Sequence, residues 1–232
     1  MHVALNGWFW DQPHTGSGQY LRHLLHALHK LAPELRLTLV IPSHQRTLDA
    51  LPPLVDVLPL RGRFGGNLGK TMFEQRGFPS ALERLGADLA HVPYWAPPLR
   101  SPIPVVCTVL DVIPLVLREY RSGVLPRLYT ALVTAATRGA TEIITISNAS
   151  RDDIVAQIGV PAERVSVTYL AADRVFHPEG DREADRAVRA RYGLDDVDDF
   201  VLYLGSFNAH KNLRLLLAAY TYVAQGAGPD VP

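Results

Sequence analysis

The chain has 232 residues, of which 47% are hydrophobic and 20% charged, and its formal net charge is zero. This balance is typical of a globular protein with a sizeable core, and it excludes the strongly basic character of most nucleic-acid-binding domains. The single cysteine, Cys107, excludes an internal disulfide. No apolar run reaches the ~20 residues that span a bilayer and no signal-peptide pattern opens the chain, so we expect a cytoplasmic protein.

Short apolar segments alternate with amphipathic ones along most of the chain. In chain order, the pattern predicts a strand at 2–6, a helix through 21–31, strands at 35–41 and 55–60, a helix at 71–85 that breaks at Pro79, strands at 88–92 and 103–109, a helix at 125–136, a strand at 142–146, a helix capped by Ser147 or Asn148, a strand at 165–168 and a charged helix at 181–192. Strands that alternate with helices predict an α/β fold with a doubly wound parallel sheet.

The loop after the first strand is long and rich in glycine and aromatic residues. Gly16 and Gly18 lie directly before the first helix, and Trp8, Phe9 and Trp10 precede them. A strand, a glycine turn and a helix N-terminus form an anion site, because free amides and the helix dipole point at the ligand. The spacing is weaker than a full dinucleotide fingerprint. Glycines needed only for close packing remain the alternative, although we expect exposed aromatics and a functional loop.

Glycines and basic residues also follow the third predicted strand. Gly62, Gly65, Gly66 and Gly69 lie among Arg61, Arg63 and Lys70. The composition predicts a mobile basic loop, or simply a solvated linker.

Residues 199–220 repeat the pattern of strand, glycine turn and helix. Phe200–Leu204 predicts a buried strand, Gly205 ends it, and apolar residues from Leu213 to Val223 recur at helical spacing. Lys211 adds a positive charge where the helix begins, which favours an anionic ligand. Seven predicted strands already complete a sheet, and the acidic run at 195–199 predicts a linker. We therefore expect three segments, 1–178 as one domain, 179–199 as a linker and 200–232 as the start of a second domain.

Ligands of doubly wound sheets bind beyond the carboxyl ends of the strands. His91 lies near the end of one predicted strand, Tyr94 and Trp95 follow that strand, and Asp111 follows the next. A carboxylate directly after a buried strand must be hydrogen-bonded or functional. No cysteine or histidine spacing indicates a metal site, and Cys107 lies in an apolar run that predicts a buried, inert thiol.

Six segments together resemble one family. They are TGSGQYLRHLLHAL, DLAHVPYWAPPL, PVVCTVLDVIPL, EIITISNASRDDI, RVSVTYLAADRVFHP and VLYLGSFNAHKNLRLLLAAY, in that order. Their order resembles retaining glycosyltransferases of family 4, closest to bacterial mannosyltransferase-like members. The resemblance implies a GT-B fold with two Rossmann-like domains, of which this chain holds the first and the opening strand–helix unit of the second.

The resemblance also implies an activity and roles for residues. A hexose, with mannose as the first candidate, is transferred with retention from a nucleotide-diphosphate sugar to a glycan or lipid-linked acceptor, without a cofactor or metal. The implied donor-diphosphate residues are Gly16, Gly18, Gly205 and Lys211. Asp111 is the implied catalytic residue beside the transferred sugar, and His91, Tyr94 and Trp95 are the expected acceptor-binding residues.

The chain departs from the family pattern in three places. Leu110 replaces the histidine of a His-Asp pair, Ser206 and His210 flank the turn without its usual arginine, and the paired-glutamate segment is not reached before Pro232. We therefore expect an N-terminal piece that is inactive alone. A non-catalytic binding module and one half of a split enzyme remain alternatives, whereas an epimerase would need acid–base residues that we do not find.

Two further contacts are predicted. Basic residues gather in the middle of the chain, at Arg61, Arg63, Lys70, Arg76, Arg100, Arg118, Arg121 and Arg127. They predict peripheral contact with the inner membrane face, with scattered solvation as the alternative. The apolar unit at 200–225 lacks neighbouring strands, so it should either self-associate or be poorly ordered.

Overall fold

The computed structural model describes residues 1–45, 51–62, 64–121, 123–173, 175–176, 180–198 and 200–226, without the side chains of 118, 121 and 224–226. Arg63, the side chains of Arg118 and Arg121, and the predicted boundaries at 178–179 and 199 therefore lie outside the described part. The chain divides into two compact units, Met1–Tyr169 and Leu170–Pro232. The domain limits that we expected from the sequence stay a prediction.

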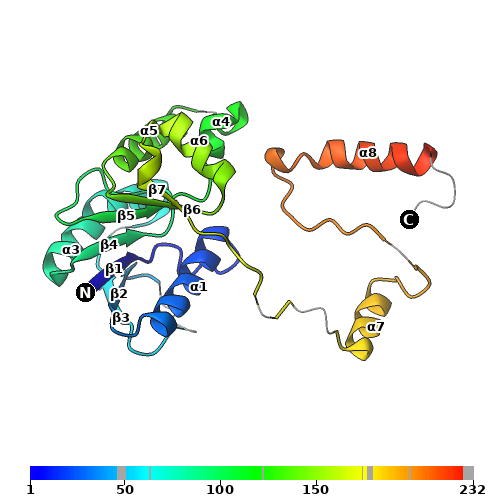
Figure 1. The fold of residues 1–232 in the computed structure, drawn as a ribbon, viewed down its shortest axis with the longest axis horizontal. Coiled ribbons are helices and arrows are strands. Elements are labelled where there is room, and N and C mark those ends of the chain that lie inside the picture. Colours follow the sequence, from blue (N-terminus) through cyan, green and yellow to red (C-terminus); the bar gives the residue numbers. More distant parts are fainter. Residues whose placement is uncertain are drawn as a thin grey trace. The chain divides into compact units, whose positions relative to one another are not determined.

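The first unit is built on a seven-stranded sheet (Figure 1) in the order β3-β2-β1-β4-β5-β6-β7. The strands are β1 His2–Asn6, β2 Arg36–Pro42, β3 Asp56–Leu60, β4 Leu89–Val92, β5 Val105–Thr108, β6 Glu142–Thr145 and β7 Val165–Val167. Every neighbouring pair is parallel. The sheet confirms the predicted doubly wound α/β fold. Strand order reverses between β1 and β4, which is where such sheets place their ligands.

Helices follow β1, β3, β5 and β6, whereas in the described residues β2 leads to β3, and β4 to β5, without a helix between them. The helices are α1 Gly16–Leu31, α2 Gly66–Met72, η1 Phe73–Gly77, α3 Phe78–Leu85, α4 Ile113–Val116, η2 Arg118–Arg121, α5 Val124–Arg138, α6 Asn148–Ile158 and η3 Ala162–Arg164. Because successive strand residues point to opposite faces, Val3 and Leu5 pack with Leu21 of α1, whereas Ala4 packs with Phe78 of α3. A third cluster joins Cys107 and neighbours on β6 to α6, so Cys107 is buried as predicted.

The segment from Gly66 to Leu85 is a continuous helix with one wide turn. η1 is a π-helical turn, in which the Phe78 amide donates to the Phe73 carbonyl. Pro79 follows that turn, where the wider spacing accommodates a residue without an N–H group. We predicted that the helix breaks at Pro79, whereas its irregular turn lies just before that residue, at Phe73–Gly77. The prediction of a basic loop that includes Lys70 is wrong, because the helix begins at Gly66.

The second unit contains α7 Arg182–Arg191, η4 Ala209–Lys211 and α8 Leu213–Gly226. The predicted strand at Phe200–Leu204 is wrong, since these residues carry no strand assignment. The seven-stranded sheet does not include them, so this segment does not add a strand to the first sheet. Within the described residues, no helix is both long and apolar enough to cross a membrane.

Candidate active site at the carboxyl edge of the sheet

The loop between β1 and α1 is closed by a helix cap. Thr15 is the N-cap of α1: its Oγ1 accepts from the Gly18 amide at 3.1 Å and donates to the Gln12 carbonyl at 2.8 Å. A Cβ on Gly18 would lie 2.0 Å from the Gln12 oxygen, whereas a Cβ on Gly16 would meet nothing within 4 Å. Gly18 is therefore explained by packing, while Gly16 faces open space in which a ligand can approach the backbone.

The aromatic residues of this loop are not exposed, which corrects our expectation. Trp8 and Trp10 are buried and Phe9 is partly buried. The guanidinium of Arg22 lies 4.5 Å from the Trp10 ring and donates two hydrogen bonds to the Trp10 carbonyl. The rings thus fix the loop to the core, and the start of α1 at Gly16 stays at the surface.

Asp111 lies in the loop after β5 and is exposed. Its Oδ1 accepts from the Ile113 amide at 3.0 Å, so the carboxylate is hydrogen-bonded and one face of it stays open to solvent. The Ser150 hydroxyl donates to the Leu110 carbonyl at 3.2 Å, and Ser147 caps α6 by accepting from the Ser150 amide, as predicted. Ser150, in the first turn of α6, therefore anchors the Asp111 loop through the Leu110 carbonyl.

His91 ends a buried polar chain beside that loop. Its Nε2 lies 2.9 Å from the Thr108 Oγ1, and that hydroxyl donates to the Tyr20 hydroxyl at 3.3 Å. Burial lowers the pKa of His91 to about 4, so the imidazole is neutral near pH 7. Burial also raises the pKa of Tyr20. Sequence reasoning missed Tyr20 and Thr108, which join α1, just past Gly16 and Gly18, to the strand that leads to Asp111.

Tyr94 and Trp95 are held inside the protein. The Tyr94 hydroxyl donates to Asn6 Oδ1 at 3.1 Å, and the Trp95 indole donates to Thr137 at 2.9 Å. Tyr94 is buried and Trp95 is half-buried. In this structure both side chains pack and orient the loop after β4, and their predicted contact with an acceptor stays a prediction.

Glu74, which no motif indicated, is fully buried under the same edge of the sheet. Lys70 Nζ lies 2.5 Å from Glu74 Oε1 and 2.6 Å from the Tyr129 hydroxyl, and Tyr129 donates to Glu74 at 3.0 Å. Burial raises the pKa of Glu74, and Lys70 opposes that rise. The ammonium also lies 5.1 Å from the centre of the Tyr94 ring. The spacing of Lys70 and Glu74 at i and i+4 within an apolar helix segment was the available signal.

In the second unit, Gly205 and Lys211 are both exposed. Lys211 ends the short helix η4, and Asn212 follows it with a φ of 47°. Gly16 and Gly18 thus lie together on α1, and Asp111 lies in the same unit in the loop after β5, whereas Gly205 and Lys211 belong to the other unit. In the described ranges no group of three metal-ligating side chains is found, and the expected absence of a metal remains a prediction.

The sheet topology and the loops at its carboxyl edge define a Rossmann-like domain of the GT-B class. WaaG, a glycosyltransferase of lipopolysaccharide biosynthesis, matches with a TM-score of 0.66 at 14% identity over 96% of this chain and 60% of that chain. The structure of Anabaena HepE in complex with UDP and glucose matches with a TM-score of 0.59 at 17% identity, over 96% of this chain and 58% of that one. These similarities establish the fold.

The model of Glycosyltransferase Family 4 matches residues 14–176, and the chain belongs to this family. The α-D-kanosaminyltransferase of Streptomyces kanamyceticus is 27% identical over 243 residues, which covers 94% of this chain and 62% of that protein. The O-antigen chain mannosyltransferase B of Escherichia coli is 35% identical over 78 residues, 34% of this chain and 20% of that protein. The chain thus spans about three fifths of the kanosaminyltransferase.

Proposed function

We propose that this chain provides the acceptor-side domain of a glycosyltransferase. The enzyme transfers a hexose, with mannose as the first candidate, from a nucleotide-diphosphate sugar to a glycan or lipid-linked acceptor with retention. The observation that carries the proposal is the family match over residues 14–176, because this segment contains both the Gly16 loop and the Asp111 loop.

The chemistry follows from the groups at the carboxyl edge. When the sugar leaves, the nucleoside diphosphate gains negative charge, and preorganised amides stabilise that charge without rearrangement. The open first turn of α1 at Gly16 supplies such amides in the first unit. Lys211, exposed beside α8, would add a positive charge from the second unit. Asp111 would hydrogen-bond the transferred sugar, and what supports this assignment is that its carboxylate is exposed in the loop after β5.

Leu110 bears on the mechanism. A side chain without polar atoms cannot hydrogen-bond the sugar, so the loop contributes only the Asp111 carboxylate and backbone groups. His91 does not replace the missing histidine directly, because it is buried and its Nε2 faces Thr108. We therefore assign the side-chain contacts with the sugar at this loop to Asp111.

Activity needs a completed donor-side domain, which we place outside residues 1–232, in the same polypeptide or in a separate subunit. Sequencing the gene beyond the codon for Pro232 distinguishes these two arrangements. The chain is then assayed alone and with the completing segment, using GDP-mannose and UDP-glucose as donors. We expect transfer or donor hydrolysis only in the completed protein.

The matched variants are Asp111→Asn and Lys211→Ala, with Asp153→Asn on the exposed side of α6 as the control. Loss of one transition-state contact of this kind lowers kcat by roughly 10²–10³-fold, and the control should retain activity. If the completed protein binds glycans but turns over no donor, the protein is a non-catalytic binding module and the enzymatic proposal is wrong.

We also propose that the start of α5 contacts the inner face of the membrane. Val124, Leu125 and Leu128 are 71%, 78% and 62% exposed on one short stretch of helix, next to Arg127. Apolar side chains beside a basic residue suit an anionic lipid surface, where each charge adds about 1 kcal/mol. Co-sedimentation with vesicles containing phosphatidylserine should be weakened by salt and by Leu125→Asp, and binding that neither change affects would contradict the proposal.

A further inference from the structure

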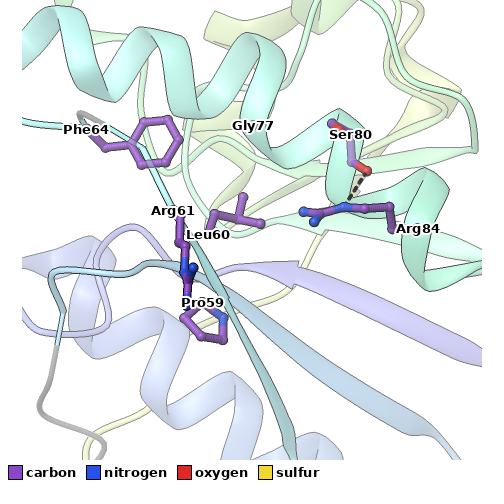
Figure 2. Close-up of a pocket in the computed structure, with 7 residues that line it drawn as sticks. All are labelled: Pro59, Leu60, Arg61, Phe64, Gly77, Ser80 and Arg84. Carbon is purple, nitrogen blue, oxygen red and sulfur yellow. Dashed lines mark hydrogen bonds between the residues drawn. The ribbon is translucent and has the colours of Figure 1, made fainter.

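A cavity of about 460 Å³ lies between the end of β3 and the helix α3 (Figure 2). Its lining residues are Pro59, Leu60, Arg61, Phe64, Gly77, Ser80 and Arg84. The volume lies within the ~300–1,000 Å³ typical of small-molecule sites. None of the roles assigned above uses this pocket, and it is built from other elements than the Gly16 and Asp111 loops.

Two arginines give the pocket its charge. Arg61 follows the last residue of β3, and Arg84 lies in the last turn of α3. Figure 2 shows the Arg84 side chain extending toward Leu60 and the strand that carries Arg61, with its Nε 3.4 Å from the Ser80 carbonyl. No lining residue is acidic, and within the described ranges no ion pair involves Arg61 or Arg84. Unpaired guanidinium groups bind carboxylates and phosphates through paired N–H donors.

Phe64 forms an apolar wall, and two glycines make room for its ring. A Cβ on Gly62 would lie 2.5 Å from the Phe64 ring, and one on Gly77 would lie 3.3 Å from it. The ring also packs edge-on against Phe73, with 5.4 Å between centroids. These contacts hold the Phe64 ring beside the end of β3, next to Gly62. A half-buried aromatic ring beside two arginines suits the apolar face of a sugar that bears a negative charge.

We propose that this pocket is a second subsite, which binds a sugar carrying a phosphate or a carboxylate. The ring of the sugar packs against Phe64 and Leu60, and Arg61 and Arg84 hold its oxyanion. In naming acidic or phosphorylated glycans as the acceptor class, the inference rests on the proposed function. The binding itself is measurable without any transfer reaction.

The test is an NMR titration of the ¹⁵N-labelled chain with glucose 6-phosphate, with glucuronic acid and with neutral glucose. We expect at least one of the charged sugars to shift the amides of Gly62, Gly77 and Ser80, and glucose to shift none of them. The charged sugar that binds more tightly identifies phosphate or carboxylate as the natural group. Arg61→Gln and Arg84→Gln should each weaken binding roughly tenfold, and both residues are exposed, so the variants should fold.

The matched control is Arg127→Gln, since Arg127 lines a separate cavity of about 520 Å³ among α4, α5 and α6. This variant should bind the charged sugar as the unmodified chain does. Three results would overturn the proposal: equal binding of glucose, unchanged binding by both pocket variants, or sugar-phosphate shifts at the amides of Gly16 and Ser17 in place of those of Gly62, Gly77 and Ser80, which would place the ligand at the start of α1. An enzyme without transfer activity that still binds the sugar here would overturn the proposed function and leave the subsite intact.

Discussion

The first strand–loop–helix segment, residues 2–31, and the last, residues 200–226, differ in what surrounds them. All five residues of β1 are buried between β2 and β4. In the last segment Phe200 is 48% exposed and Leu204 is 93% exposed. The sequence patterns are similar, since each has an apolar run, glycine and a helix with an apolar stripe.

The difference shows which parts of the pattern are local. A helix satisfies its own backbone hydrogen bonds, so α8 forms without neighbours, whereas a strand must exchange its bonds with another strand. Within the described residues, Phe200–Leu204 has no neighbouring strand to pair with, and it does not form a strand. Local sequence therefore fixes helices here, and strand formation depends on residues elsewhere.

Hydrogen exchange should give the largest contrast between the two segments. In dilute, monomeric chain, the β1 amides should exchange at least ~10³-fold more slowly than those of Val201–Leu204, because core strands open only with global unfolding. The measurement is amide exchange followed by NMR at pH 7. Protection at 201–204 that grows with protein concentration would indicate self-association through residues 200–225, which light scattering would confirm. If the Val201–Leu204 amides were protected from exchange in a monomer, the expected difference between the two segments would be wrong.

Removing the Glu74 carboxylate should destabilise the first unit strongly. Glu74→Ala leaves the partly buried ammonium of Lys70 without its partner, a change that typically costs about 3–5 kcal/mol. Urea unfolding followed by circular dichroism measures the free energy of unfolding. Glu83→Ala on the exposed side of α3 is the control and should change it by less than about 0.5 kcal/mol.

A double variant, Lys70→Met with Glu74→Leu, separates the lost charge partner from lost packing. If it is much more stable than Glu74→Ala, the unpaired ammonium accounts for the loss. Equal destabilisation of both variants would instead attribute the effect to packing.

His91 should make the stability of the first unit depend on pH. Its pKa is about 4 in the folded chain and about 6.5 when unfolded. The unfolded chain therefore binds a proton that the folded chain does not, and stability is lost as the pH falls from about 6.5 to 4, by about 3 kcal/mol. His91→Gln should flatten this part of the stability profile, while His14→Gln, in the exposed part of the loop before α1, should not. An unchanged slope in His91→Gln would assign the effect to other groups.

Alanine at three glycines gives the smallest and most selective test. Gly18→Ala places a methyl group against the Gln12 carbonyl oxygen and should cost about 1–3 kcal/mol. Gly16→Ala meets open space and should be close to neutral for stability. Gly205→Ala in the second unit meets only the ring end of Tyr203, whose hydroxyl would lie 3.0 Å away, and a small shift of that exposed part of the chain should allow the methyl group. Melting temperatures measure all three.

The same variants separate packing from ligand approach. In the completed enzyme, Gly16→Ala should raise the KM for the nucleotide sugar if the donor diphosphate approaches this turn. Unchanged KM with unchanged stability would remove Gly16 from the proposed donor site.

The seven strands were predictable because they are largely apolar runs bounded by glycine, proline or polar residues, and buried parallel strands have that composition. The N-cap at Thr15 was not predicted, because a pattern of apolar residues does not indicate a cap. The Gly16 and Asp111 loops were placed at the carboxyl edge by the alternation of strands and helices alone. The roles of these residues in donor binding and catalysis rest on the family resemblance and stay predictions.

What the sequence could not supply were contacts between distant residues. Glu74 and Tyr129 are 55 positions apart, and His91 meets Thr108 from another strand. Trp8 is buried against Phe73 of η1, and Trp10 is buried with Leu21 of α1 and Leu39 of β2. These partners are distant in the sequence, so the aromatic run alone could not predict its burial. The strand at Phe200 failed for a different reason, since its pattern is correct for a strand that has neighbours.

The π turn at Phe73–Gly77 lets the helix between β3 and β4 absorb one residue. A regular α-helix advances about 100° per residue, and a π turn holds one extra residue within about the same rotation. Deleting that residue would therefore regularise the helix and leave the segment before the turn close to its present orientation relative to α3, so that Lys70 would still face Tyr129. A one-residue insertion in a regular stretch of the same helix would instead rotate Lys70 away from Tyr129 by about 100°. Single-residue gaps that separate relatives in this helix should therefore fall at the π turn.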